Sequence, residues 1–332
     1  MNASVSSPVS PRMAALYAAT PPLRTDALGV SGGHVLHLQE FGNPDGMPAV
    51  VLHGGPGSGS SPLLRRFLDP NRYRIIGFDQ RGAGRSTPRG ATRDNTMADL
   101  LADLQAIRQH LGIERWLVVG GSWGATLALA HALAESQAVS ALLLRATFLA
   151  RAEDITRFFQ GAVADLPEAW SRFAAIAPPA RRHALLEVLT EGLQGDAPQA
   201  APFALAWWRW EAAMSGALPP TDEPEGDALQ ELIGRYRVQS HYLSHCCWLD
   251  APPLLDRCGS LPCVPTAILH GGSDHICPPD GARELHRRLP HSTLRIIPGV
   301  GHDPTHPEMV AAMLRALDSY AASGRFEPEV NS

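Results

Sequence analysis

The chain has 332 residues, of which 45% are hydrophobic, and a formal net charge of −5 at pH 7. This length and apolar content suit one large α/β domain that buries a sizeable core and carries an insertion. The negative charge and the absence of any lysine or arginine run exclude a typical nucleic-acid-binding protein. No apolar stretch reaches the roughly 18 residues that a membrane span needs, so we expect neither a nucleic-acid nor a membrane partner.

The N-terminal 22 residues are predicted to form a disordered or extended tail. Residues 1–11 are rich in Ser, Pro and Val, and they lack the basic start and apolar block of a secretory signal peptide. We therefore expect a cytoplasmic protein.

Apolar strand-like runs alternate with helical patterns in residues 23–148, and the alternation resumes in residues 251–325. Such alternation is typical of βαβ units. It predicts an α/β core with a mostly parallel, doubly wound sheet, formed by 23–148 together with 251–325. The first part contains predicted strands near 35–40, 49–52, 73–78, 116–119 and 141–144, and predicted helices near 97–111 and 123–135.

A glycine-rich loop, His53-Gly-Gly-Pro-Gly-Ser-Gly59, directly follows the apolar run Ala49–Leu52. Backbone N–H groups in such a loop can bind a phosphate or stabilise an oxyanion. The chain contains no lysine, which removes the phosphate-binding Walker pattern, and Pro56 interrupts the dinucleotide fingerprint. A plain flexible turn is the remaining alternative. We expect the Gly55 N–H to be one donor of an oxyanion hole.

The segment Gly120-Gly-Ser-Trp-Gly124 lies between the apolar run Trp116–Val119 and a small-residue helical run. A sharp turn from strand to helix exposes a serine hydroxyl, and glycines on both sides let the strand and helix close around it. Ser122 is therefore predicted to be a nucleophile, with the N–H of Trp123 as the second oxyanion donor. The same pattern also occurs in ordinary turns, so the rest of the chain has to supply the partners.

Residues 149–250 differ from the flanking sequence. Strand-like runs give way to helical periodicity, and five of the seven tryptophans lie here. This pattern predicts a helical cap that closes over Ser122, excludes water and shapes the substrate pocket. Acidic residues outnumber arginines in the segment, which suits a substrate with a free amino group, although the acidic stretch Asp222–Asp227 is also typical of a solvated loop.

Two later loops supply an acid and a histidine. Asp274 follows the apolar run Thr266–His270, and His302 lies on the glycine-rich loop after Thr293–Ile297. His302 would take the proton of Ser122, and Asp274 would orient the imidazole. The order serine, acid, histidine is that of the α/β-hydrolase fold. A structural loop histidine is the alternative for His302, and Asp303 is the weaker candidate for the acid.

Five cysteines lie between residues 246 and 277 without the spacing of a disulfide framework, so they are expected to be reduced. His241, His245, Cys246 and Cys247 invite a metal interpretation, but adjacent cysteines rarely bind one ion together. Buried thiols are the simpler account. We expect no metal and no cofactor.

Three motifs together resemble the prolyl iminopeptidases, which are α/β-hydrolases that release an N-terminal proline. The motifs are His53–Gly57, Phe78-Asp-Gln-Arg-Gly-Ala-Gly-Arg-Ser86 and Gly120–Gly124, and the resemblance runs from about Leu23 to Leu317. It implies an α/β-hydrolase fold with an inserted helical cap, and a serine aminopeptidase that acts on small peptides.

The resemblance also implies a substrate-binding set within the cap. Phe148 matches the aromatic wall for the proline ring, and Phe158 and Phe159 match a segment that usually carries tyrosines. Glu211, in Trp210-Glu211, matches the glutamate that binds the substrate's ammonium group. The residues support this independently, because a carboxylate among tryptophans is costly to bury without a cation. A surface position on its helix is the alternative for Glu211.

Three positions depart from the family pattern. Gln239 stands where the family has a second amine-binding glutamate, Leu243 replaces a phenylalanine of the proline pocket, and Ala83 replaces a frequent cysteine. An amide clamps an ammonium less strongly than a carboxylate, and Leu243 removes an aromatic face. An esterase or amidase acting on small acyl substrates without an amine is therefore the alternative function. A non-catalytic binding protein is a third, which the complete Ser, Asp and His set disfavours.

Overall fold

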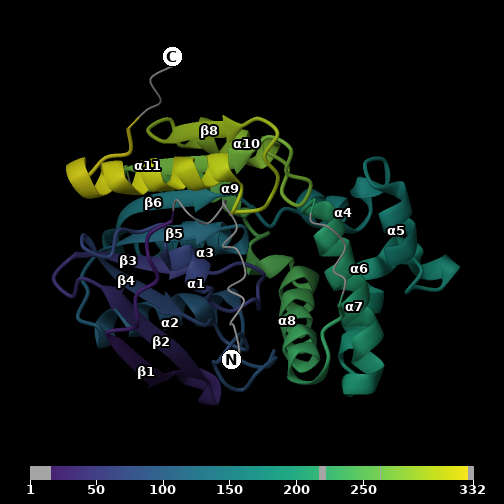
Figure 1. Cartoon of the computed structure of the whole chain (residues 1–332). Coiled ribbons are helices and arrows are strands. Elements are labelled where there is room, and N and C mark those ends of the chain that lie inside the picture. The colour runs from purple at the N-terminus through teal and green to yellow at the C-terminus, as the bar shows by residue number, and fades with distance from the viewer. Residues whose placement is uncertain (1–15, 217–221, 262, 328–332) are drawn as a thin grey trace, which may run out of the picture.

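Within the described residues, 16–216, 222–261 and 263–327, the computed structural model contains one sheet in the strand order β1-β2-β4-β3-β5-β6-β7-β8 (Figure 1). β1 and β2 pair antiparallel, as do β2 and β4, and every other pairing is parallel. The strands are β1 Arg24–Gly29, β2 Val35–Gly42, β3 Met47–Leu52, β4 Tyr73–Phe78, β5 Trp116–Gly121, β6 Val139–Arg145, β7 Thr266–Gly271 and β8 Thr293–Ile297. The predicted mostly parallel α/β sheet is confirmed.

Strand β1 is not evident from the sequence. Its segment has no apolar run, and most of its residues are exposed. It forms a strand because it pairs along its whole length with β2, from Arg24 opposite Glu40 to Gly29 opposite Val35. The pairing partner, rather than local hydrophobicity, therefore makes this segment a strand.

Strand β5 shows how the sheet is buried on both faces. Trp116 and Val118 belong to one hydrophobic cluster, which includes helices α2 (Met97–His110) and α3 (Trp123–Ala134). Leu117 and Val119 point the other way, into a second cluster with helix α11 (Pro307–Ser323). Successive side chains of a strand face opposite sides. The continuous apolar runs that the sequence shows are thus those of strands covered on both faces.

The remaining core helices are α1 Pro62–Arg65 and α10 Asp280–Arg288. Helices α4 to α9 all come from the chain between β6 and β7, and Figure 1 shows α4 to α8 gathered to the right of the sheet. Their bounds are α4 Ala152–Phe159, α5 Pro167–Ala174, α6 Leu185–Leu193, α7 Ala197–Met214, α8 Gly226–Ser244 and α9 Leu254–Arg257.

Helix α8 is fastened to the core by its last turns. The Tyr242 hydroxyl donates to Asn95 Oδ1 at 2.8 Å, and a ring nitrogen of His241 bonds to the Asn95 carbonyl at 3.1 Å. The Tyr242 ring also packs edge-on against Trp123, with the ring centroids 4.9 Å apart. Because Trp123 follows the predicted nucleophile, α8 is held next to it.

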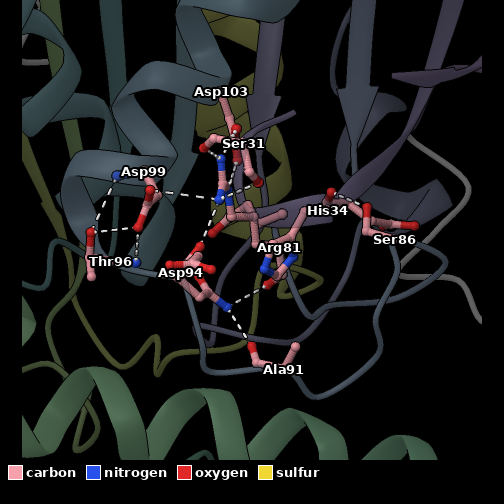
Figure 2. Close-up of polar contacts among 12 residues, drawn as sticks. Ser31, His34, Arg81, Ser86, Ala91, Asp94, Thr96, Asp99 and Asp103 are labelled. Atoms are coloured by element: carbon pink, nitrogen blue, oxygen red, sulfur yellow. Dashed lines mark hydrogen bonds and ion pairs between the residues drawn. The ribbon is translucent and has the colours of Figure 1, made fainter. Parts of the chain in front are cut away.

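The motif Phe78–Ser86 folds around a buried arginine. Arg81 forms two hydrogen bonds to Asp103 on α2, at 2.6 and 2.7 Å, and donates to the carbonyl of Asp94 at 2.6 Å (Figure 2). Ser31 accepts further hydrogen bonds from this guanidinium through its carbonyl and hydroxyl oxygens. A buried guanidinium needs a full set of charged and polar partners. The motif therefore fixes the loop that follows β4.

Residues 1–15 of the predicted tail lie outside the described residues. Residues 16–22 have no regular secondary structure, but they are attached to the core: Leu16 is buried, and the Tyr17 hydroxyl donates to Asp318 at 2.8 Å. Within the part of the chain that the structure describes, no helix is long and apolar enough to cross a membrane.

Candidate active site

Ser122 occupies the turn between β5 and α3 in a strained conformation, with φ 57° and ψ −123°. A side chain rarely adopts this region of backbone space, so the surroundings must hold it there. Gly120 and Gly124 make this possible. A Cβ on Gly120 would lie 2.2 Å from the Gly124 carbonyl oxygen, and one on Gly124 would lie 2.2 Å from the Leu52 carbonyl oxygen. The turn that the sequence predicted therefore exists, and it depends on both glycines.

Loops from neighbouring strands meet at this turn. Leu52 at the end of β3 pairs with Gly120, and Gly121 pairs with Arg145 at the end of β6. Arg145 in turn pairs with Leu269 on β7. In a parallel sheet the carboxyl ends of the strands lie along one edge, which is where sites form in such folds.

His302 and Asp274 are in direct contact. His302 Nδ1 lies 2.7 Å from Asp274 Oδ2, and the other carboxylate oxygen accepts the backbone N–H groups of Ile276 and Cys277, at 3.0 and 2.8 Å. Burial acts to raise the pKa of Asp274, but His302, the Cys277 N–H and His270 outweigh it and hold the pKa below its ordinary value. Asp274 is therefore a carboxylate that fixes the Nδ1–H tautomer of His302.

Ser122 and His302 line the same cavity. Among the described residues, the Ser122 hydroxyl has no hydrogen bond to His302, and it lies beside the Cys277 thiol, with which it interacts. Contacts between a nucleophile and its base are often loose without substrate and tighten when it binds. The arrangement is thus compatible with a serine–histidine pair that forms its hydrogen bond in the substrate complex.

Sequence reasoning missed Arg145, a buried residue at the end of β6. Its Nη1 donates to the His302 carbonyl oxygen at 2.8 Å, and its guanidinium lies directly against Gly121. Burial lowers the pKa of Arg145, while the charge of Asp274 acts in the opposite direction. A charged residue that ends an otherwise apolar strand was the signal that could have identified it.

His270, at the end of β7, was also missed. Its Nδ1 accepts the backbone N–H of Thr147 at 3.1 Å, and its Nε2 donates to the Cys277 carbonyl at 2.8 Å. An imidazole that accepts one hydrogen bond and donates another is neutral. Burial also lowers the pKa of His270, which favours the neutral form. His270 thus supports the loop that carries Asp274.

The predicted oxyanion loop is joined to the nucleophile turn through Gln80. The Gln80 amide donates to the His53 carbonyl at 3.0 Å and accepts the indole N–H of Trp123 at 2.9 Å. The backbone N–H of Gln80 donates to His53 Nε2 at 3.0 Å. Gly55 lines the cavity with φ +112°. Trp123 is the first residue of α3, so no carbonyl within the helix can accept its N–H.

A cavity of about 210 Å³ adjoins Ser122. Its wall includes five of the predicted substrate-binding residues: Phe148, Phe158, Glu211, Gln239 and Leu243. Phe159 is not among the lining residues. Its ring is buried against Phe158, Phe173 and Trp207, so the structure places it in the interior of the helical segment and corrects the expectation that it faces substrate.

Glu211 is neither on the surface nor without a cation. Arg235 Nη2 donates to Glu211 Oε2 at 2.5 Å, and the Tyr236 hydroxyl donates to the same oxygen at 3.1 Å. Gln239 Nε2 donates to the other oxygen at 2.9 Å. The sequence suggested that a buried Glu211 would need a cation and that substrate would supply it. In the structure Arg235 on α8 supplies a cation to Glu211.

The five cysteines are free thiols, and burial raises the pKa of Cys277 well above its ordinary value. Within the described residues, no group of three or more His, Cys, Asp or Glu side chains is arranged to hold a metal ion.

Comparison with known proteins supports the fold and gives a family. Residues 48–307 match the family model described as alpha/beta hydrolase fold. The chain is 40% identical to a proline iminopeptidase of Xanthomonas citri over 93% of this chain and 100% of the relative. It is 38% identical to one of Xylella fastidiosa, with the same coverage of both chains.

A solved structure, a proline iminopeptidase-related protein of Thermus thermophilus, superposes with a TM-score of 0.55 at 23% identity, covering 90% of this chain and 98% of that one. At 23% identity the structural similarity supports only the shared fold. The sequence relatives go further, because they share more than a third of their residues over nearly the whole chain. The chain belongs to the proline iminopeptidase family of α/β-hydrolase-fold proteins.

Proposed function

We propose that this chain is a serine hydrolase that releases N-terminal proline, or a similar small residue, from small peptides. Ser122 is the nucleophile, His302 the general base and acid, and Asp274 the residue that orients His302. The observation that carries the proposal is the 2.7 Å contact between His302 Nδ1 and Asp274 Oδ2 beside a serine held at a strained turn in the same cavity. The names of the relatives support the choice of proline.

The reaction follows from this geometry in two halves. His302 Nε2 takes the Ser122 proton as the hydroxyl oxygen attacks the substrate carbonyl, and the backbone N–H groups of Gly55 and Trp123 stabilise the oxyanion. His302 then gives the proton to the departing amine, which leaves an acyl group on Ser122. Water, deprotonated by His302, attacks the acyl carbon. The bond between this carbon and the Ser122 oxygen then breaks, His302 returns the proton to the Ser122 oxygen, and the free acid leaves.

The acyl group is proposed to lie in the cavity of about 210 Å³. Phe148, Phe158 and Leu243 form an apolar wall for a small ring, while Glu211 and Gln239 provide hydrogen-bond acceptors for its nitrogen. The limited volume favours a small first residue. The rest of the substrate would extend away from the cavity.

We also propose that residues 149–250 act as a cap over this cavity. Three of the residues that line it, Phe158, Glu211 and Gln239, belong to helices α4, α7 and α8 of this segment. A cap that supplies part of the wall excludes water from the acyl-enzyme and limits the substrates that can enter.

One observation favours a second candidate, an esterase or amidase for small acyl groups without an amine. Glu211 is already paired with Arg235, so the cavity offers a substrate ammonium less negative charge than a free carboxylate would.

Prolyl and alanyl p-nitroanilides, offered beside short acyl esters, separate the two candidates. The proposal predicts release of p-nitroaniline from the prolyl substrate, and complete loss of turnover of every substrate in Ser122→Ala at an unchanged circular dichroism spectrum. Turnover of esters with no release from any amine-bearing anilide would overturn the peptidase proposal. Near wild-type activity of Ser122→Ala would remove Ser122 from its role.

A further inference from the structure

The polar end of the cavity has an unusual balance of charge. Glu211, Arg235 and Gln239 all line it, and the carboxylate and the guanidinium are in direct contact at 2.5 Å. The side chains of Glu211 and Arg235 are only 15% and 30% exposed, respectively, so the pair is largely shielded from water. Opposite charges that are paired in this way present little net charge to a third group. Arg235 and Gln239 stand one helical turn apart on α8, so one helix presents both to Glu211.

Two buried polar atoms at this end of the cavity have no hydrogen-bond partner among the described residues. Because a carboxylate only accepts hydrogen bonds, the Gln239 amide must turn its Nε2 toward Glu211, which leaves its Oε1 buried without a partner. Arg235 Nε is likewise buried without a partner. A buried donor or acceptor without a hydrogen bond destabilises the protein. The free acceptor and the free donor here could both be satisfied by a substrate group that is polar but uncharged.

A protonated amine meets a different situation. It can reach Glu211 only by sharing the carboxylate with Arg235 or by displacing the guanidinium, and it would then lie close to a positive charge. Like charges at short distance disfavour each other most strongly where water is excluded. The ion pair therefore reduces the advantage that a charged amine gains from Glu211.

We propose that Arg235 is a specificity-determining residue which neutralises Glu211, so that the cavity selects acyl groups by hydrogen bonding rather than by positive charge. The substrate class is small cyclic or branched acyl groups that carry a polar atom on the α-carbon, the carbon bonded to the carbonyl carbon, with or without a charged amine. This inference rests on the proposed hydrolytic function of Ser122, and it concerns only the acyl end of the substrate.

Two acyl groups of nearly equal size test it. Prolyl and tetrahydrofuran-2-carbonyl differ in the ring atom, which is a protonated amine in the first and an uncharged ether oxygen in the second. Each is prepared as a p-nitroanilide and as a benzyl ester. The assay runs at pH 7, below the pKa of a free α-amino group, about 7.7–8.0. The quantity measured is the ratio of kcat/KM for prolyl over tetrahydrofuran-2-carbonyl with the same leaving group.

Wild type is expected to give a ratio below about tenfold, and Arg235→Met to raise it by tenfold or more. Methionine keeps part of the apolar stem and removes the charge, while Tyr236 and Gln239 still bind Glu211. Arg235→Lys keeps a cation and should retain the wild-type ratio. The double variant Arg235→Met with Glu211→Gln removes both charges and should return the ratio to near that of wild type.

Both kcat/KM values are measured on the same preparation of each variant. A smaller fraction of folded protein lowers the two values equally and leaves their ratio unchanged. A wild-type ratio above a hundredfold, or an unchanged ratio in Arg235→Met, overturns the inference. Hydrolysis of the esters but not of either anilide would overturn the peptidase proposal alone, because the ester ratio still tests Arg235.

Discussion

Arg145 joins the sheet to the loop that carries His302, since its Nη1 donates to the His302 carbonyl oxygen at 2.8 Å. Arg145 ends β6, whereas His302 lies between the end of β8 at Ile297 and the start of α11 at Pro307. The guanidinium also lies against Gly121, one residue before Ser122. The buried Arg145 side chain thus contacts both the turn that carries Ser122 and the loop that carries His302.

Replacement of Arg145 by methionine is expected to lower kcat by about 10- to 100-fold, which is the range for losing one hydrogen bond from a charged donor. KM should change less, because the contact positions His302 rather than substrate. Arg283→Met, on the exposed side of α10, provides a control with the same change of residue. Steady-state kinetics of both variants measure the effect. An equal loss in the two would show that Arg145 has no positioning role.

Asp274→Asn is expected to reduce kcat by about 10³- to 10⁴-fold while the fold is retained, because an amide no longer stabilises the imidazolium or the Nδ1–H tautomer of His302. Asp303→Asn is the matched control, since Asp303 is adjacent to His302 in sequence but accepts bonds from Thr305. The control should lose less than about tenfold. If Asp303→Asn were the more damaging change, the assignment of the acid would be wrong.

The buried His131 on α3 is expected to make the stability of the protein depend on pH. Burial, with a smaller contribution from Arg108, lowers its pKa from 6.5 to about 4. The unfolded chain therefore takes up a proton first, so this contribution to stability is complete above pH 6.5 and is lost as the pH falls toward about 4. The loss amounts to roughly 3 kcal/mol at about 1.36 kcal/mol per pKa unit.

His131→Gln tests this assignment. His131 Nε2 accepts the indole N–H of Trp116 at 3.1 Å, and a glutamine oxygen can accept the same bond without titrating. Urea unfolding at pH 7, 5.5 and 4.5 should show a smaller pH dependence in the variant than in wild type. If the free energy of unfolding changed equally with pH in the variant and in wild type, His131 would not be the cause of the pH dependence.

Gly124→Ala is expected to destabilise the protein by about 4 kcal/mol or more and to abolish activity, because the added Cβ would lie 2.2 Å from the Leu52 carbonyl oxygen. Gly29→Ala is the control: no atom lies within 4 Å of a Cβ built there, so its effect should stay within about 0.5 kcal/mol. Urea unfolding and p-nitroanilide hydrolysis measure both variants. A stable, active Gly124→Ala would contradict the close approach of β3 and α3.

Periodicity and turn residues predicted most of the core. The runs that became β2 to β8 are apolar enough to be recognised alone, whereas β1 is not, because its pairing with β2 is what makes it a strand. Ser122, Asp274 and His302 could be proposed because each follows a strand, and the carboxyl ends of parallel strands lie together.

The fold alone decided which side chains meet at the cavity. From the sequence, Glu211 could be proposed as a binding residue that needs a cation. Arg235 could not be identified as that cation, because it lies 24 positions away and on another helix. It also placed Phe159 at the substrate, whereas packing turns that ring into the interior. Local patterns determine which segments form strands and helices and which loops carry reactive groups. Contacts between side chains on different helices depend on how the helices pack, and for this protein they set the charge of the pocket.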